Sequence, residues 1–122
     1  MNRHQYRVGI VFALYKHLLL NKDLKECFSD DFSEDEDEFL NGICNDLMVN
    51  IDTYITEIAG HLKRWSFERL NYVDQAILLE AVSEIRLGLN NKNIVIDEAI
   101  RIAKEYCDED SYRYINGVLD NL

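Results

Sequence analysis

The amino-acid sequence predicts an all-α fold of about six or seven helices, and three observations support it. None of the 122 residues is proline, the residue that most strongly ends or kinks a helix. Apolar residues recur at spacings of three and four along most of the chain, which is the period of one helix face. No segment alternates apolar and polar residues as a half-buried strand does. The length and the 48% apolar content are sufficient for a folded core.

The first helix is predicted at residues 3–20, followed by a loop and a short helix near residues 24–28. Next comes the acidic run "SDDFSEDEDEF", in which Ser33 and Glu36 have the spacing of a capping box. Because carboxylates are stabilised at the positive end of a helix dipole, we interpret this run as a solvated helix start rather than as a metal or partner site. The apolar face of the first helix is expected to comprise Val8, Val11, Phe12, Tyr15, Leu18 and Leu19.

An apolar stripe continues over residues 43–62, either as one long helix with a kink near Asn50 or as two stacked helices. The segment "KRWSFERL" is predicted to be a short helix or turn. After it, Asn71 can cap a helix that has Asp74 at its third position, and Gly88 ends that helix in the left-handed conformation. The inward face of this helix is expected to contain Val73, Ile77, Leu78, Ala81, Val82 and Ile85.

Two more helices are predicted after the loop "LNNKN". The first covers "IVIDEAIRIAKEYC", and the second begins near Asp108 or Asp110, either of which can act as its cap. Within the second, the Asn116-Gly117 pair is a hairpin signal, but the apolar residues around it follow the helical period. A glycine inside a helix costs about 1 kcal/mol relative to alanine. We therefore expect Gly117 to be a packing notch, where another helix backbone comes close.

The formal net charge of −10 is distributed unevenly along the sequence. Residues 1–25 carry a net charge of +4, residues 26–62 contain eleven acidic side chains and no lysine or arginine, and residues 63–122 carry −3. An acidic protein repels nucleic acid, but a local basic patch can still bind it within a Debye length of ~10 Å. The start of the first helix is the candidate for such a patch.

The sequence contains no pattern typical of catalysis or metal binding. The three histidines and three cysteines lack metal-ligand spacing, and there is neither a phosphate-binding glycine loop nor a nucleophile motif. We therefore expect no enzyme activity, no metal and no cofactor, and we interpret Cys27, Cys44 and Cys107 as reduced thiols. No run approaches the ~18 apolar residues of a membrane span, and no signal peptide is recognisable. The expected location is the cytoplasm.

Three stretches together resemble the NusB family of bacterial transcription antitermination factors. They are "RHQYRVGIVFALYKHLL" at the start, "RLNYVDQAILLEAVSEI" in the second half, and "IVIDEAIRIAKEYCDEDSYRYINGVLDNL" at the end. The last two contain the D-x-A-I-L motif, the E-A-x-x-x-A-K helix and the closing N-G-V-L-D of the family, in the same order. The resemblance implies one domain made of two small helical bundles, at residues of about 1–65 and about 66–122.

The resemblance also implies a function. A member of this family binds the boxA element of nascent RNA together with a ribosomal small-subunit protein, NusE, and keeps the transcription complex processive on ribosomal RNA operons. Single-stranded RNA is bound by cations that hold phosphates and by aromatic rings that stack on bases. By the family motifs, the expected RNA contacts are Arg3, His4, Arg7, Asp110, Arg113 and Tyr114, and the expected contacts with the protein partner are Tyr15 and Asp74.

Two other classes of function stay open. A helical protein-interaction module with little or no RNA binding of its own agrees with the net charge of −10 and with the thin basic start, where His4 and Gln5 replace basic residues usual in the family. An enzyme is suggested by ribosomal RNA cytosine methyltransferases that carry a NusB-like domain, but we expect no room for a catalytic domain in 122 residues. Self-association as a homodimer is also compatible with the sequence. For Tyr114, we expect stacking on a base rather than burial in the core.

Overall fold

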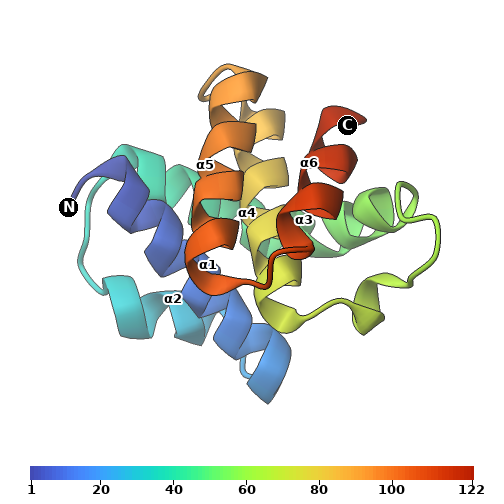
Figure 1. Ribbon diagram of the computed structural model, residues 1–122. Helices are drawn as coiled ribbons and strands as arrows, with labels where there is room; N and C mark the ends of the chain where they lie inside the picture. The colour runs from blue at the N-terminus through green and yellow to red at the C-terminus, as the bar shows by residue number, and fades with distance from the viewer.

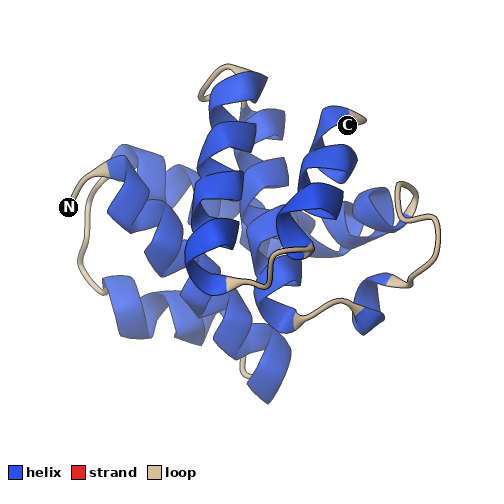
Figure 2. Cartoon of the chain, viewed as in Figure 1, coloured by secondary structure: helices blue, strands red, loops and turns tan.

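The chain folds into six α-helices and one short 3-10 helix, without any β-strand (Figure 1, Figure 2). The computed structural model describes residues 1–122. The all-α prediction is therefore confirmed, and so are the bounds of the first helix and the short helix within "KRWSFERL". None of the helices is both long enough and apolar enough to cross a membrane. In chain order, the elements are α1 (Arg3–Leu20), α2 (Leu24–Phe32), α3 (Glu38–Ala59), η1 (Phe67–Arg69), α4 (Tyr72–Leu87), α5 (Lys92–Tyr106) and α6 (Ser111–Asp120).

Helix α4 lies at the centre of the fold. All side chains from Asp74 to Glu84 are buried, which is the pattern of a helix that is covered on every side. Its neighbours are α1, α3, α5 and α6, and Figure 1 shows α5 in front of it and α6 beside it. The 31 buried hydrophobic residues form one continuous core around α4. The division into two bundles at about residue 65 stays a prediction.

Helix α1 begins with a capping box that was not predicted from the sequence. The side chain of Asn2 accepts a hydrogen bond from the backbone N–H of Gln5, at 2.9 Å. In return, the side-chain oxygen of Gln5 accepts one from the backbone N–H of Asn2, also at 2.9 Å. Two of the free N–H groups at the helix start are thereby satisfied.

The predicted apolar face of α1 is confirmed in part, because Val8, Tyr15 and Leu18 pack against the core, but the most deeply buried stripe lies to one side of that face. Arg7 pairs with Glu84 of the central helix, which turns the residues next to it inward. Of the predicted face only Val11 is fully buried, whereas Leu19 is exposed. The buried stripe, on a helix that contacts both α2 and α4, consists of Tyr6, Ile10, Val11, Ala13 and Leu14.

The acidic run does begin a helix, but not at the predicted cap. Ser33 follows the last turn of α2, and α3 begins after Asp37, whose side chain accepts a backbone N–H of the first turn at 2.9 Å. The predicted capping box of Ser33 and Glu36 is therefore wrong. Asp35 accepts a hydrogen bond from the Tyr6 hydroxyl at 2.9 Å, so the run also ties α1 to the start of α3.

Helix α3 is one unbroken helix, so the prediction of a single long helix is confirmed, and the alternative of two stacked helices with a break near Asn50 is wrong. The Asn50 side chain instead donates a hydrogen bond to Asp46 of the same helix, at 3.0 Å. Asp46 also accepts hydrogen bonds of 2.7 Å from the hydroxyls of Tyr54 and of Ser83 in α4. This carboxylate therefore joins α3 to the central helix.

Helix α4 ends at Gly88 as predicted, since its φ of 66° lies in the left-handed region. Asn71 precedes the helix, but its side chain makes no capping hydrogen bond, and Asp74 is buried instead. Helix α6 begins after Asp110, one of the two predicted starts, likewise without a side-chain cap. The two predicted caps are therefore helix boundaries only.

The Asn116-Gly117 pair lies inside α6, as the apolar period predicted. The predicted packing notch at Gly117 is wrong, because no neighbouring atom lies within 4 Å of the position that a Cβ would occupy there. A close approach occurs instead at Gly9 of α1, where a Cβ would lie 2.6 Å from the ring of Phe32 in α2. Packing therefore does not explain Gly117, which is exposed.

Replacing Gly117 by alanine should stabilise the protein. Inside a helix, alanine is favoured over glycine, and the new methyl group meets no neighbour, so we expect the free energy of unfolding to rise by up to ~1 kcal/mol. Gly88→Ala is the matched control: its positive φ disfavours a side chain, and the same urea titration should show a loss of about 1–2 kcal/mol. A loss of stability in Gly117→Ala would show that a close helix contact exists there after all.

Candidate nucleic-acid interface

Arg7, a predicted RNA contact, is buried in the fold. Its guanidinium forms a bidentate ion pair with Glu84 of α4, with Nε–Oε2 and Nη2–Oε1 distances of 2.8 and 3.0 Å. Glu98 of α5 lies 3.6 Å from the same guanidinium, and the ring of Phe39 of α3 lies against it. Only 5% of the Arg7 surface is exposed, so the side chain is not presented to an RNA phosphate. The predicted phosphate contact is therefore corrected to a structural ion pair.

A second buried carboxylate lies beside this pair. Glu80 is one turn before Glu84 on α4, and one of its oxygens has no hydrogen-bond partner. Burial and the neighbouring charge of Glu84 raise the pKa of Glu80 well above its usual value. Burial opposes the ionisation of Glu84 as well, but hydrogen bonds with Arg7 and Glu80 outweigh it and lower the pKa of Glu84. Of the two neighbouring carboxyl groups, Glu80 is therefore the one whose protonated form is favoured, and Glu84 the one whose ionised form is favoured.

Arg3 and His4, two further predicted RNA contacts, lie at the start of α1. Arg3 is exposed, and its guanidinium carbon lies 4.8 Å from the centre of the Phe39 ring. His4 is half-buried and faces two carboxylates of α5: its Nδ1 is 3.1 Å from Glu98, and its Nε2 is 3.8 Å from Glu105. The carboxylates of α5 therefore offset part of the basic start, and Arg3 is the cation there that stays open to a phosphate.

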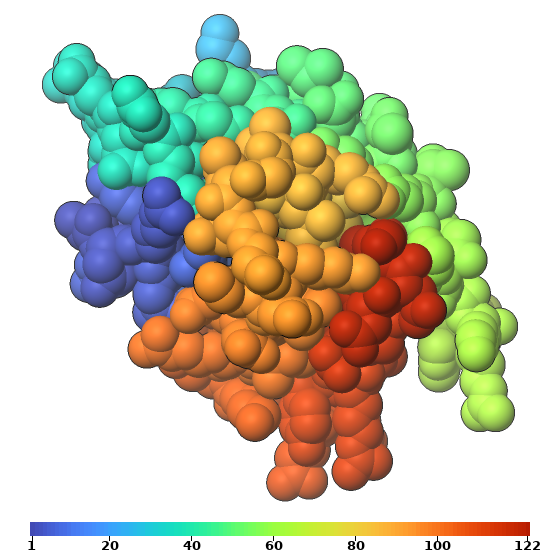
Figure 3. Space-filling model, turned by 90° about the horizontal axis from the view of Figure 1, so that it is seen from above, coloured from blue at the N-terminus to red at the C-terminus, as the bar shows by residue number.

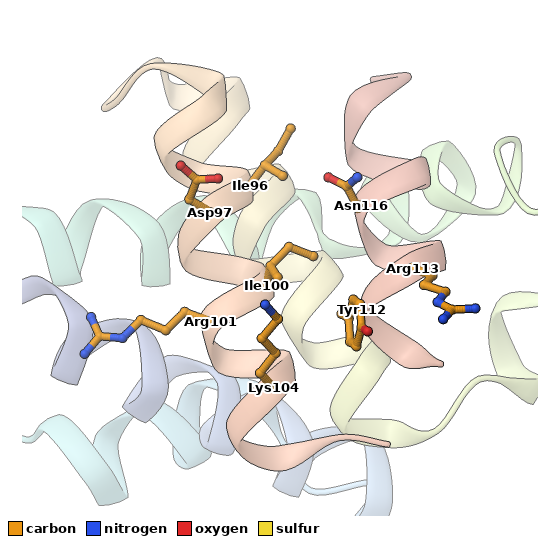
Figure 4. A pocket seen from close by; sticks show the side chains of 8 residues that line it. All are labelled: Ile96, Asp97, Ile100, Arg101, Lys104, Tyr112, Arg113 and Asn116. Carbon is orange, nitrogen blue, oxygen red and sulfur yellow. The ribbon is translucent and has the colours of Figure 1, made fainter. Parts of the chain in front are cut away.

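A groove of about 630 Å³ separates α5 from α6 (Figure 4). Arg113, a predicted RNA contact, extends from the α6 side, and Arg101 extends from the α5 side in the opposite direction. Lys104 lies between them, with its ammonium 5.5 Å from the centre of the Tyr112 ring. All three residues line the groove, which contains a single carboxylate, Asp97, but both guanidinium groups are directed outward on its two sides and only the Lys104 ammonium lies within it.

Arg101 and Lys104 were not predicted from the sequence. Both residues line one side of the groove, but the net charge of the C-terminal half is negative, so a sum of charges along the sequence does not single them out. The available signal was their spacing of three residues, which places both on one face of a helix. Arg101 lies 3.8 Å from Glu98 and from Glu105, whereas Lys104 forms no ion pair. Lys104 is therefore the cation of α5 that is free to bind a phosphate.

Tyr114 and Asp110, the remaining predicted RNA contacts, do not line this groove. Both line a hollow beside the start of α4. The Tyr114 hydroxyl donates a hydrogen bond to Asp74, which also accepts one from Ser111 at 3.0 Å. Burial, together with this bond, raises the pKa of Tyr114. Its hydroxyl is thus anchored against the central helix while its half-buried ring borders the surface, and stacking of this ring on a base stays a prediction.

The two residues predicted to contact a protein partner differ in exposure. Asp74 is 1% exposed and is held by Ser111 and Tyr114, so it is not presented to a partner and its role is corrected to joining α6 to α4. Tyr15 of α1 is half-buried and packs against the core, with part of its surface open. A partner contact at Tyr15 stays a prediction.

No three or more His, Cys, Asp or Glu side chains are grouped so that they could hold a metal ion. The cysteines are free thiols, with Cys27 and Cys44 buried and Cys107 half-buried. Burial raises the pKa of Cys44 to about 12, which keeps this thiol protonated at neutral pH. The candidate interface therefore consists of cations and aromatic rings around α5 and α6.

Comparison with known proteins identifies a family. A model of the NusB family matches residues 4–122. The transcription antitermination protein NusB of Sulfurimonas denitrificans is 36% identical over 126 aligned residues, which cover 98% of this chain and 95% of that protein. NusB of T. maritima has the same fold, with a TM-score of 0.86 and 28% identity over 99% of this chain and 89% of that chain. A chain in the crystal structure of antitermination factors NusB and NusE in complex with dsRNA also shares the fold, with a TM-score of 0.82, 24% identity, and coverage of 99% and 96%.

Removing one partner of the buried Arg7–Glu84 pair should be strongly destabilising. Arg7→Ala leaves the Glu84 carboxylate buried without its partner, for which a loss of about 3–5 kcal/mol in the free energy of unfolding is typical. Arg3→Ala removes an exposed cation from the same helix and should lower it by about 1 kcal/mol or less. Urea unfolding followed by circular dichroism measures both variants. Equally small losses would contradict a buried pair.

Glu80→Gln should stabilise the protein at neutral pH. Because the pKa of Glu80 is higher in the folded than in the unfolded chain, its contribution to stability is complete below the usual value of 4.5 and is lost as the pH rises. Glutamine has no proton to lose, so its advantage should be present at about pH 7 and vanish at about pH 4. Free energies of unfolding at several pH values measure the difference. An advantage that did not shrink in acid would argue against the raised pKa.

Proposed function

The chain belongs to the NusB family, and from this premise we propose that it is an RNA-binding transcription antitermination factor. In this role it binds boxA-type RNA together with the ribosomal protein NusE and promotes processive transcription of ribosomal RNA operons. The match to the family over residues 4–122 supports the proposal. The structural observation that carries it is a set of unpaired cations, one on each of three neighbouring helices, which we call the strip of cations.

This strip runs across the start of α1, α5 and α6, which lie side by side in Figure 3. Arg3 belongs to α1, Lys104 to α5 and Arg113 to α6, and none of the three forms an ion pair. Unpaired cations attract phosphates at short range even where the net charge of the protein is negative. The strip is therefore suited to the phosphates of one RNA strand.

A net charge of −10 weakens the attraction of RNA at longer range. We therefore expect the affinity of the isolated chain for RNA to be low, and a protein partner that also binds the RNA to increase it. NusE is the proposed partner, and the related fold in a complex of NusB and NusE with dsRNA supports this choice. Tyr15 is half-buried on α1, and Leu19 and Leu20 are exposed at the end of the same helix, which offers an apolar surface for a protein contact.

The alternative is a helical protein-interaction module that binds little or no RNA. The exposed leucines of α1 would serve such a module, but the groove between α5 and α6 and its free cations would have no role in it. The cations therefore favour RNA binding. We expect neither catalysis nor a cofactor, and we expect the chain to act in the cytoplasm, where bacterial RNA is transcribed.

A titration with boxA-like single-stranded RNA, with and without NusE, tests the proposed function. We expect weak binding to the chain alone and tighter binding when NusE is present. Affinity should fall as the salt concentration rises, because phosphate contacts release counterions. A chain that binds NusE but no RNA under either condition would be an interaction module instead.

The same titration with Arg113→Ala tests whether the strip of cations contacts RNA phosphates. The variant should fold normally, because Arg113 is exposed and unpaired, and the slope of log affinity against log salt should fall by about 0.7 to 1. Lys25→Ala, which removes an exposed cation of α2 outside the strip, is the matched control and should keep the slope of the wild type. Equal slopes for all three proteins would contradict a phosphate contact at the groove.

A further inference from the structure

The segment between α3 and α4 carries the only tryptophan of the chain, Trp65, with 58% of its surface exposed. Tryptophan is usually largely covered by protein, and exposed tryptophans are enriched at binding surfaces. Lys63, Arg64 and Arg69 lie close to it in the sequence, and all three are exposed. None of them forms an ion pair. An exposed ring thus stands among three unpaired cations on a chain whose net charge is −10.

A hollow of about 360 Å³ lies between this segment and α6. Trp65 and Tyr114 contribute aromatic rings to its lining, and Lys63 and Arg64 contribute cations. Gly117 lines it from α6, and no carboxylate takes part. The volume lies at the small end of the ~300–1,000 Å³ that ligand pockets occupy. The hollow therefore has the size and the lining for a small, flat group that carries negative charge nearby.

The hollow also gives a reason for the glycine inside α6. A side chain at position 117 would meet no neighbouring atom within 4 Å, and the glycine lines the hollow, so a side chain there would extend into open space. Glycine weakens a helix by about 1 kcal/mol relative to alanine, and packing does not require it here. What Gly117 provides is therefore an unfilled space beside Trp65.

The chemistry of this hollow fits an unstacked base of single-stranded RNA. Every base has a π face that can stack on an aromatic ring, and cations beside the ring can hold the neighbouring phosphates. A second hollow that Tyr114 lines has a different charge, because its three carboxylates, Asp74, Asp108 and Asp110, outnumber its one cation, Arg69, and would repel a phosphate. The two hollows share the rings of Trp65 and Tyr114 but differ in charge. The hollow at Gly117 is therefore the better site for RNA, because cations and no carboxylate line it.

We propose that Trp65 and the hollow beside α6 form a base-binding subsite for single-stranded RNA, with a base on Trp65 and the flanking phosphates on Lys63 and Arg64. This inference rests on the proposed function and extends the strip of cations beyond α6. In Figure 3 the segment before α4, in yellow-green, lies on the side of α6 that faces away from α5. An RNA strand that crosses the groove between α5 and α6 would reach the subsite next.

The fluorescence of Trp65 tests the subsite directly, because the chain has no other tryptophan. BoxA-like RNA is titrated into the chain, and a parallel series contains NusE. The Trp65→Phe variant is the blank, whose emission is subtracted because it does not come from Trp65. We expect the emission of Trp65 to be quenched in proportion to the bound fraction, which labelled RNA measures independently. Bound RNA without any change in the emission would overturn the subsite and leave the proposed function intact.

Substitutions at Trp65 give the second measurement. Trp65→Ala should weaken RNA binding about 5- to 150-fold, which corresponds to ~1–3 kcal/mol for one stacked base. Trp65→Phe keeps a ring and should retain most of the affinity. Tyr72→Ala, which removes an aromatic ring that is 42% exposed and lies outside the hollow, is the matched control and should bind RNA as the wild type does. Unfolding curves show whether each variant is folded.

Gly117→Leu adds a side chain to the lining of the hollow while position 65 remains tryptophan. It should fold normally, because no atom lies within 4 Å of the new Cβ, and it should weaken RNA binding at least about fivefold. Gly42→Leu, at the other α-helical glycine without a neighbour within that distance, is the matched control. Affinity equal to that of the wild type in both Trp65→Ala and Gly117→Leu would overturn the subsite. An emission that responds to NusE and not to RNA would assign the hollow to the protein partner, and a wild type that binds no RNA at all would overturn the proposed function as well.

Discussion

The buried ion pair between Arg7 and Glu84 is the contact on which the arrangement of the helices depends. A guanidinium can be buried only where an opposite charge balances it and acceptors bind its N–H donors. This pair therefore fixes the rotation of α1 against the central helix. Phe39 of α3 and Glu98 of α5 meet the same guanidinium, and four helices thereby converge on one charge. Arg3 lies one turn before Arg7 on the same face of α1, so the pair also places this cation at the edge of α5.

Two further buried contacts act in the same way at other places on α4. Asp74 accepts hydrogen bonds from Ser111 and Tyr114 of α6, and Ser83 donates one to Asp46 of α3. Apolar packing has no direction and allows helices to slide, whereas buried hydrogen bonds are satisfied in one arrangement only. Helices α1, α3 and α6 are therefore each held in register with α4 by a direct polar contact. Helix α5 is held indirectly, because its Glu98 contacts Arg7, which in turn contacts α4. The spacing between the surface cations of α1, α5 and α6 is fixed as a consequence.

Local signals were sufficient to predict that the helices exist, because a helical period and a residue such as Gly88 act within a few positions of the chain. They were insufficient where two residues compete for one role, as Ser33 and Asp37 do for the start of α3. They also failed where the partner is distant in sequence. Arg7 and Asp74 were predicted from the family motifs to be surface contacts, but both are buried, and their partners lie 77 residues away for Arg7 and 37 and 40 residues away for Asp74. Burial of such residues follows only from which helix faces which.

The same limit explains why the candidate site was only partly predicted. The family motifs led to Arg3 and Arg113, which are exposed and unpaired, but Lys104 and Trp65 lie outside the positions that those motifs single out. Net charge summed along the chain placed the cations at the N-terminus, whereas folding pairs Arg7 there and leaves free cations on α5, on α6 and before α4. What an RNA strand meets is the charge left unpaired at the surface within about one Debye length, ~10 Å. An acidic chain can therefore present a basic strip, because its carboxylates neutralise some cations inside the fold and leave others free.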